Sequence, residues 1–208
     1  MVTESLHSDT SQIKLRVAFV HPDLGIGGAE RLLVDLAYGL HLKGHDIHVF
    51  TSHYDPTHCF DETKSLSIST FGDFLPRGIF GLGYLFFAFL RGIYLSIRLI
   101  FLSKNFDIIV VDQLSLTIPL LRFKKSKIVF YCHFPDQLLA KRGGFLKQLY
   151  RKVFDALEEY TIRMSDQVLV NSEFTLETFR NTFKTIKNNP DILYPAIKVE
   201  NYNQSLFK

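Results

Sequence analysis

The chain has 208 residues, 47% of them hydrophobic, which is enough to bury one substantial core. Its 24 basic and 21 acidic residues nearly balance, so no overall field attracts nucleic acid. Cys59 and Cys132 lack metal-ligand spacing and indicate reduced thiols rather than a disulfide framework. The polar start contains no apolar signal segment. We expect a disordered tail over 1–14 and one domain over 15–195, facing the cytosol.

An apolar run over 15–20 leads through a glycine-rich loop into a helical pattern over 29–43. The glycines of the loop are Gly25, Gly27 and Gly28. A ligand can approach backbone that carries no Cβ, and the N–H groups of a helix start attract an anion. An ordinary strand-to-helix turn is the alternative. The spacing lacks the third glycine of G-x-G-x-x-G, and no acidic residue ends the next strand at 51–53, which disfavours a Rossmann oxidoreductase.

Further apolar, β-branched runs alternate with helical patterns along the chain. The expected strands cover 15–20, 46–51, 107–111, 127–132, 167–171 and 192–194, with 67–71 as a further candidate. This alternation predicts an α/β fold, a Rossmann-like parallel sheet with helices on both faces. Ligands collect at the carboxyl ends of such strands, so the residues that follow each run form one candidate rim.

The segment 79–103 is the most hydrophobic part of the chain, but Arg91 and Arg98 interrupt it on one helix face. A helix that crosses a membrane needs about 20 mostly apolar residues. We therefore favour a helix that lies in the membrane surface, with both arginines at head-group level or against the protein. The side chains expected to enter the lipid are Phe86, Phe87 and Phe89. A core helix that covers the sheet is the alternative.

Several stretches resemble the eukaryotic α-1,3/1,6-mannosyltransferases of dolichol-linked oligosaccharide assembly, which are retaining glycosyltransferases of the GT-B class. They are HPDLGIGGAERL at 21–32, HYDPTHCF at 53–60, LPRG at 75–78, FYCHFPD at 130–136 and VNSEFT at 170–175. The glycine-Ala-Glu-Arg element is shared by many retaining GT-B enzymes, whereas the stretches at 53–60 and 130–136 identify a much smaller group of enzymes. The resemblance covers 15–195 and points to the N-terminal half of such an enzyme.

The resemblance implies transfer of mannose from GDP-mannose to a mannosylated chitobiosyl-pyrophosphoryl-dolichol, first in α-1,3 and then in α-1,6 linkage. It places the reaction on the cytosolic face of the endoplasmic reticulum membrane, with no metal and no cofactor beyond the donor substrate. In this family the N-terminal domain holds the acceptor and the C-terminal domain binds the nucleotide sugar. Other glycosyltransferases of the pathway are further candidate partners.

Carried over by position, the three loop glycines would approach the donor diphosphate or the reacting sugar. His133 would contact the transferred mannose and help to hold developing positive charge. Further candidates for the acceptor are Asp23, Asp112 and Asp136 on its sugars and Lys141 with Arg142 on its pyrophosphate. Arg77 would also suit an anionic head group.

The resembled enzymes cross into their second domain just after the position of 193–195, and this chain ends at Lys208. Their donor motif pairs two glutamates separated by seven residues; here only Glu158 and Asp166 imitate it, which we interpret as chance. We expect 196–208 to begin the interdomain segment and the chain alone, without a donor domain, to be inactive. A noncatalytic, membrane-docked binding module or truncated paralogue is the alternative.

Overall fold

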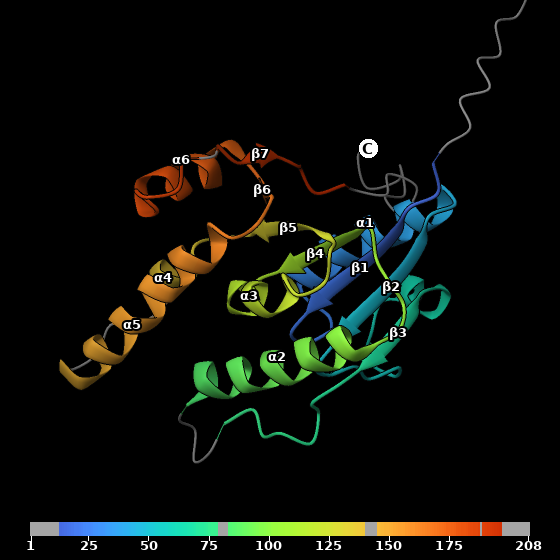
Figure 1. The fold of residues 1–208 in the computed structure, drawn as a ribbon, viewed down its shortest axis with the longest axis horizontal. Coiled ribbons are helices and arrows are strands. Elements are labelled where there is room, and N and C mark those ends of the chain that lie inside the picture. The colour runs from blue at the N-terminus through green and yellow to red at the C-terminus, as the bar shows by residue number, and fades with distance from the viewer. Residues whose placement is uncertain (1–12, 79–82, 140–144, 188, 197–208) are drawn as a thin grey trace, which may run out of the picture.

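The computed structural model describes residues 13–78, 83–139, 145–187 and 189–196. Within them the chain forms a parallel sheet of seven strands in the order β3-β2-β1-β4-β5-β6-β7 (Figure 1). The strands are β1 (Arg16–His21), β2 (Asp46–Thr51), β3 (Ser67–Thr70), β4 (Ile108–Asp112), β5 (Lys127–Cys132), β6 (Gln167–Val170) and β7 (Asp191–Ile192). The predicted strands are confirmed, and the order reverses beside β1, where such sheets bind ligands.

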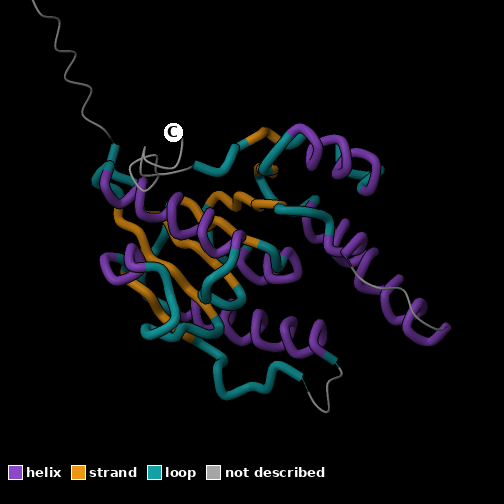
Figure 2. Tube along the Cα trace, turned by 180° about the vertical axis from the view of Figure 1, so that it is seen from behind, coloured by secondary structure: helices purple, strands orange, loops and turns teal. Residues whose placement is uncertain are grey.

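Helices cover both faces of the sheet, as predicted. They are α1 (Gly28–Leu42), α2 (Tyr84–Phe101), α3 (Ile118–Leu121), α4 (Asp136–Leu139), α5 (Phe145–Ile162) and α6 (Glu173–Thr182), with 3-10 turns η1 (Asp61–Ser65) and η2 (Ser115–Thr117). Figure 1 shows α2 and α3 in front of the sheet, and Figure 2, seen from behind, shows α1 over the opposite face. The helix α5 runs outward from the end of the sheet that carries β6 (Figure 1).

The two cores follow from the period-2 alternation of β1. Phe19 points toward α1 and packs with Leu33 and Val34, whereas Ala18 and Val20 point to the face that α2, α3 and α6 cover. Each apolar strand therefore buries both of its faces, as parallel sheets require. The arrangement leaves the carboxyl ends of the strands as the place where loops can build a site.

The hydrophobic segment forms α2, whose inner side belongs to the core. Leu95 and Leu99 are fully buried against the sheet, while the rings of Tyr84 and Phe86 near the start of the helix are exposed. By length and composition α2 is the one helix among the described residues that could cross a membrane, but its inner side packs on the sheet and its outer side is apolar.

The two arginines of α2 differ in their surroundings. Arg91 was expected at head-group level or against the protein, and the structure buries it against the protein, leaving 6% of the residue exposed. Arg98 stays on the surface, where its guanidinium lies 4.9 Å from the centre of the Phe71 ring. Among the phenylalanines, Phe86 is exposed, Phe87 is half-buried, and Phe89 packs edge-on against Phe154 of α5.

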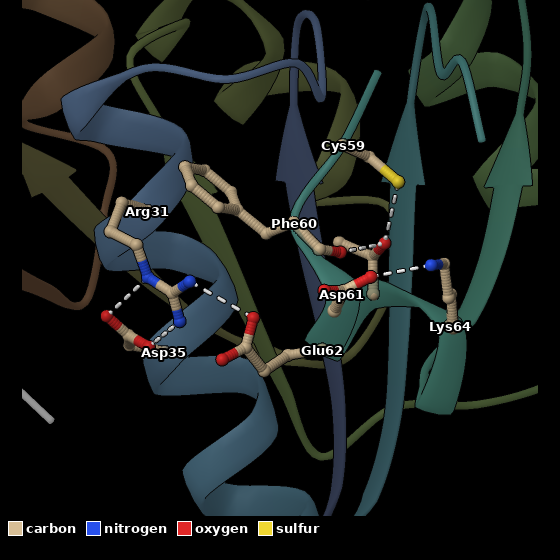
Figure 3. A network of polar contacts seen from close by, with 8 residues as sticks. Arg31, Asp35, Cys59, Phe60, Asp61, Glu62 and Lys64 are labelled. Carbon is tan, nitrogen blue, oxygen red and sulfur yellow. Dashed lines mark hydrogen bonds and ion pairs between the residues drawn. The ribbon is translucent and has the colours of Figure 1, made fainter. Parts of the chain in front are cut away.

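Arg31, the arginine of the glycine-loop motif, has a structural role. Figure 3 shows its guanidinium between Asp35, one turn further along α1, and Glu62 of η1, which lies 3.0 Å away. The same guanidinium lies over the ring of Phe60. Arg31 thus fixes the loop after β2 against α1, and the pKa of its guanidinium is raised because the hydrogen bonds to Asp35 and Glu62 outweigh burial.

Candidate functional site

A buried charged network joins the carboxyl ends of three neighbouring strands. Asp112 ends β4 between β1 and β5, and its carboxylate is 2% exposed. One carboxylate oxygen lies 2.8 Å from Nδ1 of His21 at the end of β1. The other lies 2.8 Å from Nε2 of His133, just after β5, off the line of an ideal hydrogen bond. Because parallel strands end at the same edge of the sheet, residues far apart in sequence meet here.

The network is charged at neutral pH. Burial alone would lower the pKa of His21, but the hydrogen bond to Asp112 and the nearby carboxylate of Glu30 outweigh burial and raise that pKa to about 9. Burial would raise the pKa of Asp112, and the contacts with His133 and His21 hold it below its ordinary value instead. An ionised carboxylate therefore lies beside a protonated His21.

His133 is the member of the network that reaches the surface, with 20% of its side chain exposed. A carboxylate only accepts hydrogen bonds, so the position of Asp112 favours a proton on Nε2 of His133. Asn171, after β6, donates a hydrogen bond to the carbonyl oxygen of His133, and the ring of Tyr131 lies 4.9 Å from the imidazole. Contacts with Asp112, Asn171 and Tyr131 thus hold the predicted His133 at the rim.

The glycine loop adjoins this network through Glu30. The carboxylate of Glu30 lies 3.6 Å from Nε2 of His21 and folds over Gly27, where a Cβ atom would collide with it. At Gly25 and Gly28 a Cβ atom would meet open space. A side chain at 27 would displace the carboxylate of Glu30 from this position, whereas nothing within the described residues requires glycine at 25 or 28.

A groove of about 180 Å³ lies beside the network between α2 and α5. Its lining includes Pro22 after β1, Ala88 of α2, Phe154 of α5 and Gln113 after β4, whose φ of 63° is in the left-handed region. Such a conformation costs free energy in a residue other than glycine and is frequent at functional sites. The groove thus combines an apolar wall with the polar rim.

Glu158 of α5 also lines the groove, and sequence analysis missed its role. Its carboxylate accepts hydrogen bonds from the backbone N–H groups of Asp136, at 2.8 Å, and Gln137, at 3.2 Å. Burial raises the pKa of Glu158 to about 7, against the effect of these hydrogen bonds. No sequence signal links Glu158 to a loop that lies 22 residues earlier.

The other predicted residues have mixed outcomes. Asp112 was expected to contact acceptor sugars, but it is buried and His21 and His133 occupy its oxygens, so it supports the site from inside. Asp23 forms an ion pair with Arg77 at the rim, and Asp136 is exposed beside the groove. Lys141 and Arg142 lie outside the described residues, as do 1–12, 79–82 and 197–208.

Two features that could imitate a site are structural. Asp166 lies at the opposite edge of the sheet from Glu158 and accepts hydrogen bonds from Ile128 N and Arg122, so the two acidic residues form no donor motif. Lys124, in the same basic cluster as Arg122, donates to the carbonyl oxygen of Leu102. Across the described ranges, no three His, Cys, Asp or Glu residues gather as metal ligands.

Comparison with known families settles what this domain is. The sequence model of glycosyltransferase family 4 matches residues 26–201. The chain belongs to glycosyltransferase family 4. Among the curated members, it is 48% identical over 205 residues to the α-1,3/1,6-mannosyltransferase ALG2 of Saccharomyces cerevisiae, covering 94% of this chain and 41% of that protein. For the ALG2 protein of Homo sapiens the identity is 46% over 209 residues, covering 98% of this chain and 50% of that protein.

The chain therefore spans half or less of the length of these relatives, and it corresponds to their N-terminal half. The resemblance inferred from the motifs is confirmed.

Solved structures agree on the fold. Sucrose-phosphate synthase from Thermosynechococcus elongatus has a TM-score of 0.59 at 14% identity, over 87% of this chain and 47% of that one. Anabaena HepE in complex with UDP and glucose has a TM-score of 0.58 at 13% identity, over 90% of this chain and 46% of that one. The fold is the Rossmann-like half of a GT-B glycosyltransferase, as predicted.

Proposed function

We propose that this family 4 chain is the acceptor-binding half of a retaining mannosyltransferase. The enzyme would transfer mannose from GDP-mannose to dolichyl-pyrophosphate-linked mannosyl-chitobiose, in α-1,3 and then α-1,6 linkage, for assembly of the N-glycan precursor. The observation that carries the proposal is the identity of 46–48% with ALG2 proteins over nearly the whole chain. The rim of the sheet supports it with a histidine, open glycine backbone and an adjoining groove.

The chemistry assigned to His133 follows from its orientation. Asp112 lies 2.8 Å from Nε2 of His133, which would leave Nδ1 available for the reacting sugar. Glycosyl transfer passes through an oxocarbenium-like state in which positive charge develops on the sugar. An imidazole backed by a carboxylate is electron-rich and stabilises such charge. Retention then needs no protein nucleophile if the leaving phosphate accepts the acceptor's proton on the same face.

The loop glycines and the groove would receive the two substrates. Gly25 and Gly28 present backbone without a Cβ atom to the donor diphosphate or the reacting sugar, and the groove beside Asp136 receives the acceptor. The exposed rings at the start of α2 favour attachment to the cytosolic face of the endoplasmic reticulum membrane. The proposal uses no metal and no cofactor besides GDP-mannose.

The proposal is tested with a version of the protein that also carries a second, donor-binding domain. Incubation with GDP-mannose and the lipid-linked acceptor should add two mannoses, one in each linkage. We expect His133→Ala to lower kcat about 100-fold or more while the KM for the acceptor changes little, because charge stabilisation acts in the transition state. His41→Ala, an exposed histidine at the far end of α1, is the matched control. An unchanged kcat for His133→Ala would make this histidine structural.

A further inference from the structure

Arg91 is an anomaly in the interior of this domain. It lies in the middle of α2, with 6% of the residue exposed, and its Nε and Nη2 atoms have no hydrogen-bond partner among the described residues. Buried polar groups are almost always hydrogen-bonded, and an unpaired buried charge is among the most unfavourable placements in a protein. Burial accordingly lowers the pKa of this guanidinium.

The carboxylates around Arg91 act on it only from a distance. The carboxylates that act on it are Asp23 and Asp73, and neither forms an ion pair with it. Asp23 is already paired with Arg77 at 2.9 Å, and Asp73 lies 2.8 Å from Nδ1 of His53. Each nearby carboxylate thus has another partner, and the guanidinium of Arg91 has no direct carboxylate contact among the described residues.

The position of Arg91 along α2 indicates what could fill this gap. Ala88, one turn earlier, and Leu85, nearly two turns earlier, line the apolar wall of the groove. Tyr84 and Phe86 are exposed at the start of the helix. A ligand that entered along α2 would pass an apolar wall first and meet a buried guanidinium next. An isoprenoid diphosphate has that order of chemistry, and the planar fork of arginine matches phosphate oxygens.

We propose that Arg91 is the buried cation of a diphosphate subsite between α2 and the loop after β1. The subsite would receive the pyrophosphate of the lipid-linked acceptor while Leu85 and Ala88 contact its first isoprenoid units. Arg77, on the exposed side of the cluster, exchanges its contact with Asp23 for the outer phosphate. The identity of the lipid rests on the proposed function, whereas the subsite itself rests on the position of Arg91.

Binding to the 208-residue chain tests the subsite. We expect farnesyl diphosphate to bind more tightly than inorganic pyrophosphate in calorimetry, because the groove contacts the isoprenoid. Arg91→Met should weaken both at least tenfold. Arg98→Met is the matched control on the same helix, because Arg98 is exposed over Phe71, and it should leave both affinities within about twofold. Titration with GDP shows whether the subsite takes the diphosphate of the donor rather than that of the lipid. Arg91→Met should leave the affinity for GDP unchanged.

Equal binding of farnesyl diphosphate by wild type and Arg91→Met would overturn the subsite, as would a loss confined to GDP. Methionine removes an unpaired charge at similar length, so the midpoint of thermal unfolding should stay the same or rise. If Arg91→Met does not fold, binding is followed instead by NMR of wild type labelled with ¹⁵N-arginine. The Nε–H resonance of Arg91 is assigned by its absence from the spectrum of Arg91→Lys. That resonance should move when farnesyl diphosphate is added, and an unmoved resonance contradicts the subsite. Because these measurements use neither GDP-mannose nor a second domain, absence of mannose transfer would contradict the proposed function and leave the subsite standing.

Discussion

At the scale of single residues, Asp112 organises the rim. Its carboxylate is shared by two histidines, one buried and protonated and the other at the surface. A buried carboxylate with paired cations is costly to disturb, since removal of one partner leaves an uncompensated charge. The rim is therefore a rigid arrangement in which His133 has one orientation before any ligand arrives.

This network predicts a dependence of stability on pH. The pKa of His21 is raised to about 9 in the folded chain and is about 6.5 when unfolded, so the folded state binds more protons between these values. The stabilisation is complete below pH 6.5 and is lost as pH rises through 9. It amounts to at most about 3.5 kcal/mol, from about 1.4 kcal/mol for each pKa unit.

The measurement is the free energy of urea unfolding at pH 7, 8 and 9. Wild type should lose stability across this range. Asp112→Asn should be less stable at pH 7, by about 3 kcal/mol, and should lose most of the slope. His41→Gln, which changes an exposed histidine, should keep the slope. An identical slope in wild type and Asp112→Asn would contradict the assignment. Glu158, with a pKa raised to about 7, acts mainly below this range.

The glycines allow structure and function to be separated. A Cβ atom at Gly28 meets open space, so Gly28→Ala should leave the free energy of unfolding unchanged or raise it by up to about 1 kcal/mol. In the two-domain enzyme it should nevertheless lower mannose transfer, because the methyl group stands where the donor approaches. Gly39→Ala, in the same helix with equally open space, should stabilise similarly and leave transfer unchanged. Equal transfer by both variants would show that no substrate approaches Gly28.

How far the sequence predicts these residues depends on where their partners lie. His133 and the glycine loop follow apolar runs directly, so the rule for strand ends places them at the rim. The role of Asp112 depends on His21, which is 91 residues away, and only the strand order brings them together. The same limit applies to Glu158, whose partners are backbone N–H groups of another element.

At the scale of elements, α2 shows why hydropathy alone was ambiguous. Leu95 and Leu99 face the sheet, whereas Tyr84 and Phe86 face outward, and both sets are equally apolar in sequence. The strands were easier to predict, and β2 and β5 begin and end at the predicted residues. A strand in a parallel sheet is apolar on both faces, so its pattern does not depend on what covers it.

The outer side of α2 predicts membrane binding that can be removed. Changing Phe86, Phe87 and Phe89 to Ser should greatly reduce co-sedimentation with vesicles of phosphatidylcholine and phosphatidylserine, because apolar contact area is lost. Phe101→Ser with Phe123→Ser is the control, since both rings are exposed at the opposite edge of the sheet. Phe89 also packs on Phe154, so Phe86→Ser alone should give a smaller loss without loosening α5. Undiminished sedimentation of the triple variant would favour a core helix or another anchor.

At the scale of the whole molecule, the candidate residues of the rim that the structure describes lie on one edge of one domain. The network, the loop glycines and the groove all lie at the carboxyl ends of the strands. The relatives are at least twice as long as the part that this chain matches. Glycosyl transfer requires both substrates to be held in register and water to be excluded, which an open edge does not provide.

We therefore expect no mannose transfer from GDP-mannose to the lipid-linked acceptor by the 208-residue chain alone. Addition of the relatives' C-terminal half as a separate polypeptide should restore measurable transfer, because it supplies the facing wall of the cleft. The His133→Ala chain should bind that half equally well and restore far less transfer, which separates assembly from chemistry. Clear turnover by the chain alone would mean that the rim by itself binds both substrates, and the division of labour between the two halves would then be wrong.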